Sequence, residues 1–288
     1  KETETPAHLK MNSTGSEWPV DKQVVFSLTV LLALSGVVGD SLLCWLLCSQ
    51  VRSSPCMVYL LNLTTADIIN LCCLAAVLLE ETIALHHQVM FSITVFLEHI
   101  SYVSDTAGLS LLAALSVESS LGVLFPSWNS HRPQHTSTVA SAVSWALAIA
   151  LHTVSALCDF WEKALACSLF QKGFLAFHML LCLLTCLSNL ALTFRSLCCP
   201  QQCSPMRIYH VICTMTITFL LWGLPLVAIR YLPEEEDVSL AFDLLLLLSM
   251  VISTAHPATY FLAWCLRWQR CREPLKVTLQ RALLSEME

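Results

Sequence analysis

The chain has 288 residues, of which 56% are hydrophobic and only 12% are charged, and its formal net charge at pH 7 is -6. A water-soluble domain needs a charged exterior, so this composition predicts an exterior that faces lipid. The acidic balance excludes nucleic acid as a partner, because no basic face is available to neutralise phosphates. The expected partners are lipid, ligand and protein.

Apolar runs of about 20 residues, the length of a membrane-crossing helix, recur along the chain. Strands of membrane barrels are only about 10 residues long, so these runs predict helices. The expected helices are Val24–Cys48, Cys56–Leu79, Met90–Leu124, Thr138–Cys158, Leu169–Leu197, Arg207–Tyr231 and Ser239–Trp264. The predicted fold class is an all-α membrane protein with seven transmembrane helices, which divides the chain into an outer tail 1–23, a membrane domain 24–264 and a tail 265–288.

The positions of Lys and Arg predict which face of this bundle is cytosolic. One side carries Arg52, Arg132, Arg195, Arg207, Arg267, Arg270, Arg272, Lys276 and Arg281. The other side has Lys22, Lys163, Lys172 and Arg230 near its helix ends, with Lys1 and Lys10 in the tail. Because cytoplasmic loops carry the excess of basic residues, the N-terminus is expected outside the cell and the C-terminus in the cytosol.

Two features of the tails add to this topology. Asn12 begins an Asn-x-Ser/Thr sequence in the outer tail and is a candidate glycosylation site, although such short matches are common by chance. In the C-terminal tail, Leu275, Leu279 and Leu283 lie four residues apart with basic residues around them. This spacing predicts an amphipathic helix that lies along the inner leaflet.

Two residues within the apolar runs point to a mechanism. Asp67 lies at the centre of the second run, where an ionisable group is costly and persists only with a partner or in a hydrated cavity. It is interpreted either as a functional site or as a neutral aspartic acid bonded to a neighbouring helix. Pro225 removes a backbone donor in the sixth run, so this helix is expected to swing about it unless the proline is merely tolerated there.

Several motifs, in one order from about Asp40 to Leu283, resemble the Mas-related G-protein-coupled receptors, a rhodopsin-like class A family, and in particular their Mas-like branch. The motifs are Leu60–Asp67, Ser116–Leu121, Val123–Trp128, Phe219–Pro225 and Glu273–Leu283. The resemblance implies a receptor rather than an enzyme, with an eighth amphipathic helix. It also implies an extracellular ligand, a heterotrimeric G protein as partner, signalling through movement of helix six with Trp222 as a packing switch, and a sodium ion near Asp67.

The chain departs from this family at the polar centre of the membrane. Asp40 stands where the family has an asparagine, and His256 replaces the asparagine of its Asn-Pro-x-x-Tyr motif, which continues here with Pro257 and Tyr260. Two carboxylates and an imidazole are therefore expected to converge beside Asp67, and like charges so close are costly. We hypothesise that this trio makes activation sensitive to pH; relaxed selection at a receptor that does not signal is the alternative.

A second departure lies at the inner end of the third helix. The resemblance assigns the position after Glu118 to an arginine that contacts the G protein, but Ser119 occupies it here. A hydroxyl cannot replace the planar fork of donors of a guanidinium, so G-protein coupling is expected to be weak. The alternative is a receptor-like protein that acts as a decoy or as a heterodimer partner without signalling.

The resemblance also implies a disulfide and a ligand pocket. Cys158 and Cys167 match the bridge between the top of helix four and the start of helix five in these receptors, on an oxidising side of the membrane. The candidate pocket residues are Ser101, Tyr102, Asp105, Gln171 and Trp222. No amine-binding aspartate stands at Ser101, so a neutral or amphipathic ligand is expected.

Other functional classes find less support in the sequence. An intramembrane enzyme would need a metal motif such as His-Glu-x-x-His, which does not occur, so no enzyme is expected. A channel or transporter could use Asp40, Asp67, Asp105 and His256 as a proton path, but the helices show no internal repeat. Cys198, Cys199 and Cys203 lack the second ligand pair of a zinc site, and no metal is expected.

Overall fold

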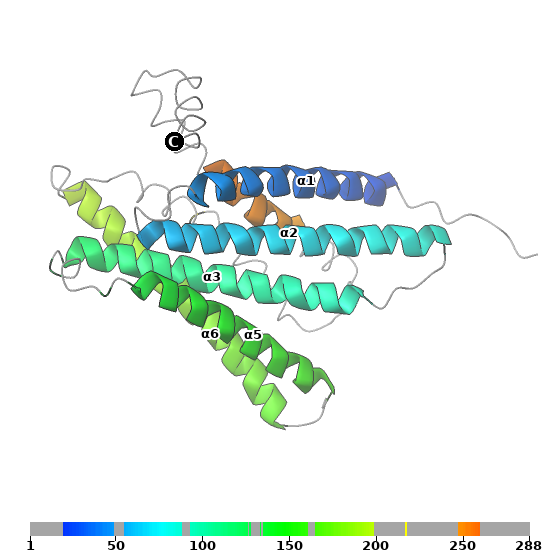
Figure 1. Ribbon diagram of the computed structural model, residues 1–288. Coiled ribbons are helices and arrows are strands. Elements are labelled where there is room, and N and C mark those ends of the chain that lie inside the picture. The colour runs from blue at the N-terminus through cyan, green and yellow to red at the C-terminus, as the bar shows by residue number, and fades with distance from the viewer. Residues whose placement is uncertain are drawn as a thin grey trace, which may run out of the picture.

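The structure, a computed structural model, describes residues 20–48, 55–87, 93–125, 127, 133, 135–160, 165–198, 217 and 247–259. The long helices are α1 (Val20–Cys48), α2 (Pro55–His87), α3 (Thr94–Leu124), α5 (Thr136–Phe160) and α6 (Leu165–Cys198). Residues 247–259 are also helical and are drawn in orange in Figure 1. No strand occurs within these described ranges.

The predicted all-α fold is confirmed for the part of the chain that the structure describes. The first five expected helices are all present, and the ends differ by a few residues, as where α2 runs to His87 instead of ending at Leu79. The expected sixth helix lies outside the described residues except for Ile217, and the seventh is described only at 247–259. The predictions for Asn12, Trp222, Pro225, Tyr260 and the tail 265–288 fall outside the described residues as well.

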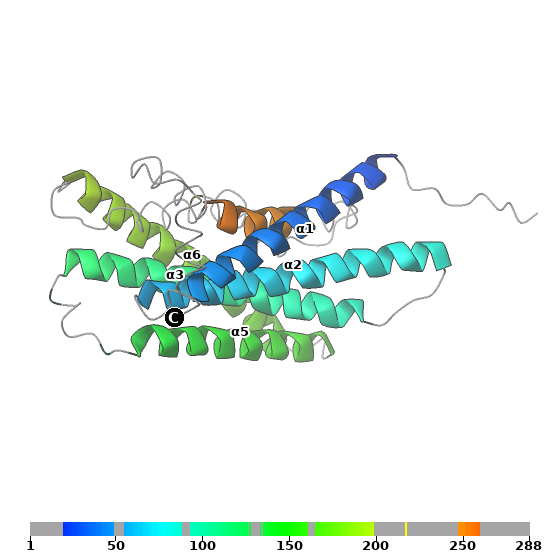
Figure 2. The same ribbon diagram turned by 45° about the horizontal axis from the view of Figure 1, so that its top comes forward.

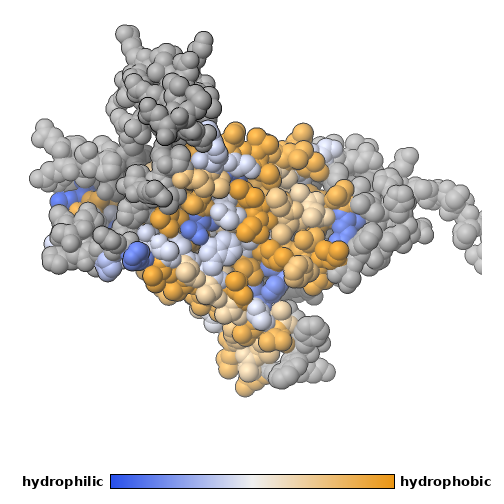
Figure 3. Space-filling view, viewed as in Figure 1, coloured by the Kyte–Doolittle hydropathy of each residue, from blue (hydrophilic) through white to orange (hydrophobic). Residues whose placement is uncertain are grey.

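Each of the five long helices is long and apolar enough to cross a membrane. Their outward side chains are apolar too, since Leu31 on α1, Val143 on α5 and Leu190 on α6 are all exposed. Figure 3 shows apolar side chains over most of the described part of one face. In water this surface would be unfavourable, so the helices are built to contact lipid.

The core lies around α2 and α3, which run side by side through the bundle. α1 crosses α2 obliquely, and both α5 and α6 pack on α3 (Figure 2). One buried apolar cluster joins four helices through Leu43, Leu47, Tyr59, Leu60, Leu63, Leu109, Leu111, Leu112, Leu115 and Cys182. A second cluster joins Ala33 of α1 and Leu71 of α2 to Met250 of the segment 247–259.

Gly36 allows α1 to approach α2 and the segment 247–259 closely. A Cβ atom at this position would lie 2.6 Å from Cδ1 of Leu71 and 2.8 Å from Oγ1 of Thr254. One turn further on, Gly39 packs against the ring of Pro257. A Cβ atom added at Gly39 would lie 3.4 Å from Cβ and Cγ of Pro257. This close packing places Asp40, the residue after Gly39, in the interior near His256.

Candidate functional site

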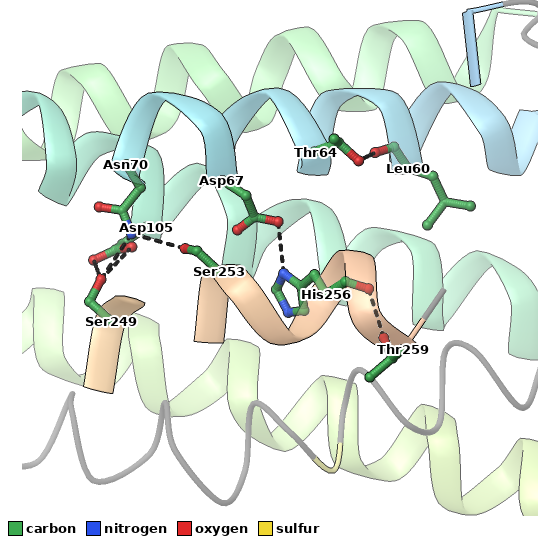
Figure 4. Close-up of polar contacts among 9 residues, drawn as sticks. All are labelled: Leu60, Thr64, Asp67, Asn70, Asp105, Ser249, Ser253, His256 and Thr259. Carbon is green, nitrogen blue, oxygen red and sulfur yellow. Dashed lines mark hydrogen bonds and ion pairs between the residues drawn. The ribbon is translucent and has the colours of Figure 1, made fainter. Parts of the chain in front are cut away.

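The centre of the site is a contact between α2 and the segment 247–259. Nδ1 of His256 lies 2.8 Å from Oδ2 of Asp67, and both side chains are buried. Figure 4 shows the two side chains pointing toward each other. At this distance the imidazole N–H donates a charge-assisted hydrogen bond to the carboxylate, which supplies the partner that a buried aspartate needs.

Asp40 completes a group of three ionisable side chains. It is 0% exposed, and neither of its carboxylate oxygens has a hydrogen-bond partner among the described residues. It lies close enough to Asp67 for the two carboxylates to interact electrostatically. Nε2 of His256 also lacks a partner within the described part of the chain. The structure therefore brings together the three residues that sequence reasoning grouped, and it leaves polar atoms in the group unsatisfied.

Asn70 is the functional residue that sequence reasoning missed. Its side-chain N–H groups donate to Oγ of Ser249 at 2.9 Å and of Ser253 at 3.1 Å, and its carbonyl oxygen accepts from Ser101. Asn70 follows Asp67 by three residues, so both side chains lie on the same face of α2. The signal in the sequence was a second polar residue, one turn from Asp67, within an apolar helix.

The network of Asn70 also contains two of the candidate pocket residues. Ser101 is only 1% exposed, so its hydroxyl serves the contact with Asn70 rather than an open surface. Oγ of Ser249 lies 3.4 Å from each of the two carboxylate oxygens of Asp105. Contacts of this length are weak hydrogen bonds. Asp105, Ser249, Asn70 and Asp67 thus form a series of polar side chains along α2, α3 and the segment 247–259 (Figure 4).

The other described pocket residues lie elsewhere. The Tyr102 ring stacks near the ring of His152 on α5, with 6.3 Å between ring centroids. Gln171 is exposed on α6. The structure therefore separates Gln171 from the buried polar network, and it places Tyr102 on the side of α3 that faces α5.

Glu118, near the C-terminal end of α3, has a partner that the sequence did not suggest. The hydroxyl of Tyr59 on α2 donates a 2.7 Å hydrogen bond to Oε2 of Glu118. Tyr59 is buried, whereas Ser119 is half-buried. Sequence reasoning left Glu118 without its neighbouring partner, because it considered only the adjacent position. The tyrosine was hidden in an apolar run and carried no recognisable signal.

Cys158 and Cys167 lie near the facing ends of α5 and α6, on either side of the connection between these helices. Both cysteines are half-buried. Their disulfide stays a prediction.

No family model matches the chain. The chain is, however, 36% identical to the Mas-related G-protein coupled receptor MRG of Homo sapiens, in an alignment that covers 100% of this chain and 76% of that receptor. The chain belongs to the Mas-related G-protein coupled receptors. Member D of Mus musculus is 35% identical over 92% of this chain and 88% of its own length. For member E of Mus musculus the identity is 32%, over 99% of this chain and 94% of that receptor.

Membership of this family confirms the resemblance read from the motifs. Mas-related receptors are receptors and not enzymes, and their class works with an extracellular ligand and a G protein. Together with the apolar helices, this makes the chain a multi-pass protein of the plasma membrane. The channel alternative finds no support among these relatives.

The sodium ion implied near Asp67 is compatible with the residues present. A hard cation prefers oxygen ligands, and Asp40 offers two buried carboxylate oxygens without a partner among the described residues. One oxygen of Asp67 is already in contact with His256. Asp40 and Asp67 are therefore the residues that would hold the ion.

Proposed function

We propose that the chain is a ligand-binding receptor with seven membrane helices within residues 24–264. The tail 1–23 lies outside the cell, and residues 265–288 form an eighth, amphipathic helix on the cytosolic face. An extracellular ligand binds near α3, with Tyr102, Asp105 and Trp222 among its contacts. Signalling follows from a swing of the expected sixth membrane helix, Arg207–Tyr231, about Pro225. Coupling to the G protein is weak.

The observation that carries this proposal is the polar series that runs from the buried Asp67 to the half-buried Asp105. An apolar bundle gains nothing in stability from burying carboxylates, so their presence favours a functional role. The series connects α2, α3 and the segment 247–259 through hydrogen bonds of side chains alone. A rearrangement of these hydrogen bonds would shift side chains of α2, α3 and the segment 247–259 together. A receptor that transmits a signal requires such a linked change.

Weak coupling is supported by the inner end of α3. Ser119 offers a single hydroxyl where a guanidinium would offer five donors, and Glu118 is held by Tyr59 instead. The contact between Tyr59 and Glu118 joins α2 to α3. This contact does not involve the expected sixth membrane helix, Arg207–Tyr231, so the contact itself does not restrain the helix that we expect to move.

The decisive experiment compares ligand-independent second-messenger levels of the wild type and Ser119→Arg at matched surface expression. We expect the arginine variant to signal more strongly. Ser119→Lys is the matched control, because it adds the charge without the planar fork and should give a smaller gain. An equally strong response of the wild type and Ser119→Arg would contradict weak coupling.

We also propose a role for the three ionisable groups at the bundle centre. A sodium ion, when bound, would supply positive charge beside Asp67 and Asp40. His256 supplies such a charge whenever it is protonated, and it already contacts Asp67 at 2.8 Å. The charge state of this group then depends on pH, which makes the activation of the receptor sensitive to acid.

A further inference from the structure

A second group of buried titratable side chains lies between α3, α5 and α6, away from Asp67. His152 of α5 is 5% exposed and His178 of α6 is 4% exposed. Thr106 of α3 lies between them, with Oγ1 2.8 Å from Nε2 of His152 and 3.3 Å from Nε2 of His178. Neither histidine belongs to a motif of the sequence, and the proposed function uses neither.

The chemistry of these contacts fixes where the hydrogens lie. Nδ1 of His178 is 3.0 Å from the backbone oxygen of Phe174, which can only accept, so Nδ1 carries a hydrogen. In neutral His178 the other nitrogen, Nε2, must then accept the hydrogen of Thr106. A hydroxyl has one hydrogen, so Nε2 of His152 has to donate to Thr106. The neutral group is therefore a directed relay from His152 through Thr106 to His178.

This relay can hold one additional proton while keeping both of its contacts with Thr106 and the contact of His178 with Phe174. When His178 takes the proton, both of its nitrogens donate, one to Phe174 and the other to Thr106. The hydroxyl of Thr106 then turns its hydrogen toward Nε2 of His152, which changes tautomer and accepts it. The three distances that define the relay need not change, because only the hydrogens move.

The rings around the relay suit a positive charge. The Phe174 ring lies between the two imidazoles, with its centroid 5.0 Å from that of His152 and 4.6 Å from that of His178. The Phe177 centroid is 5.9 Å from the His178 ring, and Tyr102 stacks on the other imidazole. An aromatic ring attracts a cation that lies over its face, most strongly where water is excluded, and the stacked ring of Tyr102 presents its face to His152.

Other ionisable groups lie near the relay. On α3, the His99 ring centroid is 5.9 Å from that of His152, so a third imidazole lies beside the relay. Two positive charges on the bridged rings would repel each other, so the relay takes up one proton. The other ionisable groups of the three helices near this level are Glu98, Tyr102, Asp105, Cys158, Lys172 and Cys182. Asp105 contacts Ser249 on another side of α3, and Lys172 is exposed. Before Cys158, the described part of α5 contributes no acid or base other than His152.

We propose that His152, Thr106 and His178 form a proton-binding site that takes up one proton and links α3, α5 and α6. The ligand of this site is the proton itself. Because the ring of Tyr102 stacks on His152, the site lies beside the candidate ligand pocket and makes external acid a regulator of that region. The proposal does not depend on G-protein coupling.

Nitrogen NMR of the full chain in lipid nanodiscs tests the site, with ¹⁵N-labelled histidine and each signal assigned by a single His→Gln variant. At pH 7.5 we expect a hydrogen on Nδ1 of His178 and on Nε2 of His152. Between pH 7.5 and pH 5 both rings should change at one common midpoint. Neutral signals from both rings over the whole range, or the same tautomer in both at pH 7.5, would overturn the proposal.

Thr106→Val removes the bridging hydroxyl and should separate the two midpoints. The matched control is Thr153→Val on α5, because Thr153 is exposed and its hydroxyl bonds only to the backbone of Ile149 in the same helix. This control should leave the common midpoint in place. Should Thr106→Val not fold, His152→Gln serves instead, and we expect the His178 midpoint to move. A His178 midpoint that stays within error of the wild type in the folded variant would refute the relay.

Discussion

The hydroxyl of Tyr59 and the carboxylate of Glu118 form a 2.7 Å hydrogen bond that joins α2 to α3 near the C-terminal end of α3. Glu118 is thus held by a side chain of a neighbouring helix. The tyrosine is buried in the largest apolar cluster, which keeps its ring in a fixed place.

Tyr59→Phe removes this hydrogen bond and keeps the ring. Hydrogen bonds to charged groups are worth about 1.5–3 kcal/mol, so we expect the free energy of unfolding in detergent to fall by about that amount. Glu118→Gln keeps an oxygen that accepts from Tyr59 and removes only the charge, so it should cost less than Tyr59→Phe, and the double variant should cost less than the sum of the two single variants. Strict additivity in this cycle would show that the two residues do not act together.

Asn70→Leu breaks contacts with Ser101, Ser249 and Ser253 in one step. Each buried hydroxyl that loses its partner costs about 1–3 kcal/mol, so we expect a large loss of thermal stability. Asn62→Leu is the matched control on the same helix, because Asn62 is half-buried and bonds only to the backbone of Val58. Equal losses for the two variants would argue against a special role for Asn70.

Gly36→Ala tests the close packing of α1. The added methyl group would lie 2.6 Å from Leu71, a fully buried side chain, and we expect a loss of about 1–3 kcal/mol from overpacking. Gly173→Ala on α6 is the control, because nothing lies within 4 Å of its would-be Cβ. That substitution should be neutral or stabilising by up to about 1 kcal/mol, since alanine favours helices. Thermal unfolding of both variants in the same detergent decides the matter.

His256→Asn removes the titratable partner of Asp67. We expect signalling of the wild type to change between pH 5.5 and pH 8, because protonation of His256 alters the charge beside two carboxylates. Signalling of the variant should vary less over this range. Identical pH profiles for the two proteins would contradict the acid-sensitive centre, and the relay at Thr106 can be separated from it by repeating the titration with His152→Gln.

Cys158 and Cys167 provide a test of the expected disulfide. Mass spectrometry of the receptor purified from cell membranes without reductant should find both residues in one cross-linked peptide pair. Cys182, buried within α6, serves as a control and should be modified by an alkylating reagent only after unfolding. Alkylation of Cys158 and Cys167 in the native protein would contradict the bridge.

Much of the fold could be predicted from the sequence, because the long apolar runs leave helices as the only way to satisfy the backbone in lipid. The convergence of Asp40, Asp67 and His256 could also be anticipated, since each interrupts an apolar run or a recognisable motif. The structure was needed to show that His256 hydrogen-bonds to Asp67 and not to Asp40.

Other contacts of the site depend on how helices rotate against each other, and sequence does not give that rotation. Tyr59 resembles any buried aromatic residue until its hydroxyl is seen beside Glu118. His152 and His178 lie far apart in sequence, and only the packing of α5 and α6 on α3 brings both to Thr106. Ser101 was expected to face a ligand, but it faces Asn70.

The burial of Asp40 has a consequence for how the bundle closes. Asp40 lies in α1, the first helix that the structure describes, and His256 lies in the last described helical segment, 247–259. Chains truncated before residue 247 would leave two carboxylates inside the bundle without the imidazole that pairs with Asp67, a defect that cellular quality control can recognise. Completion of this group depends on contact between the first and last described helical segments.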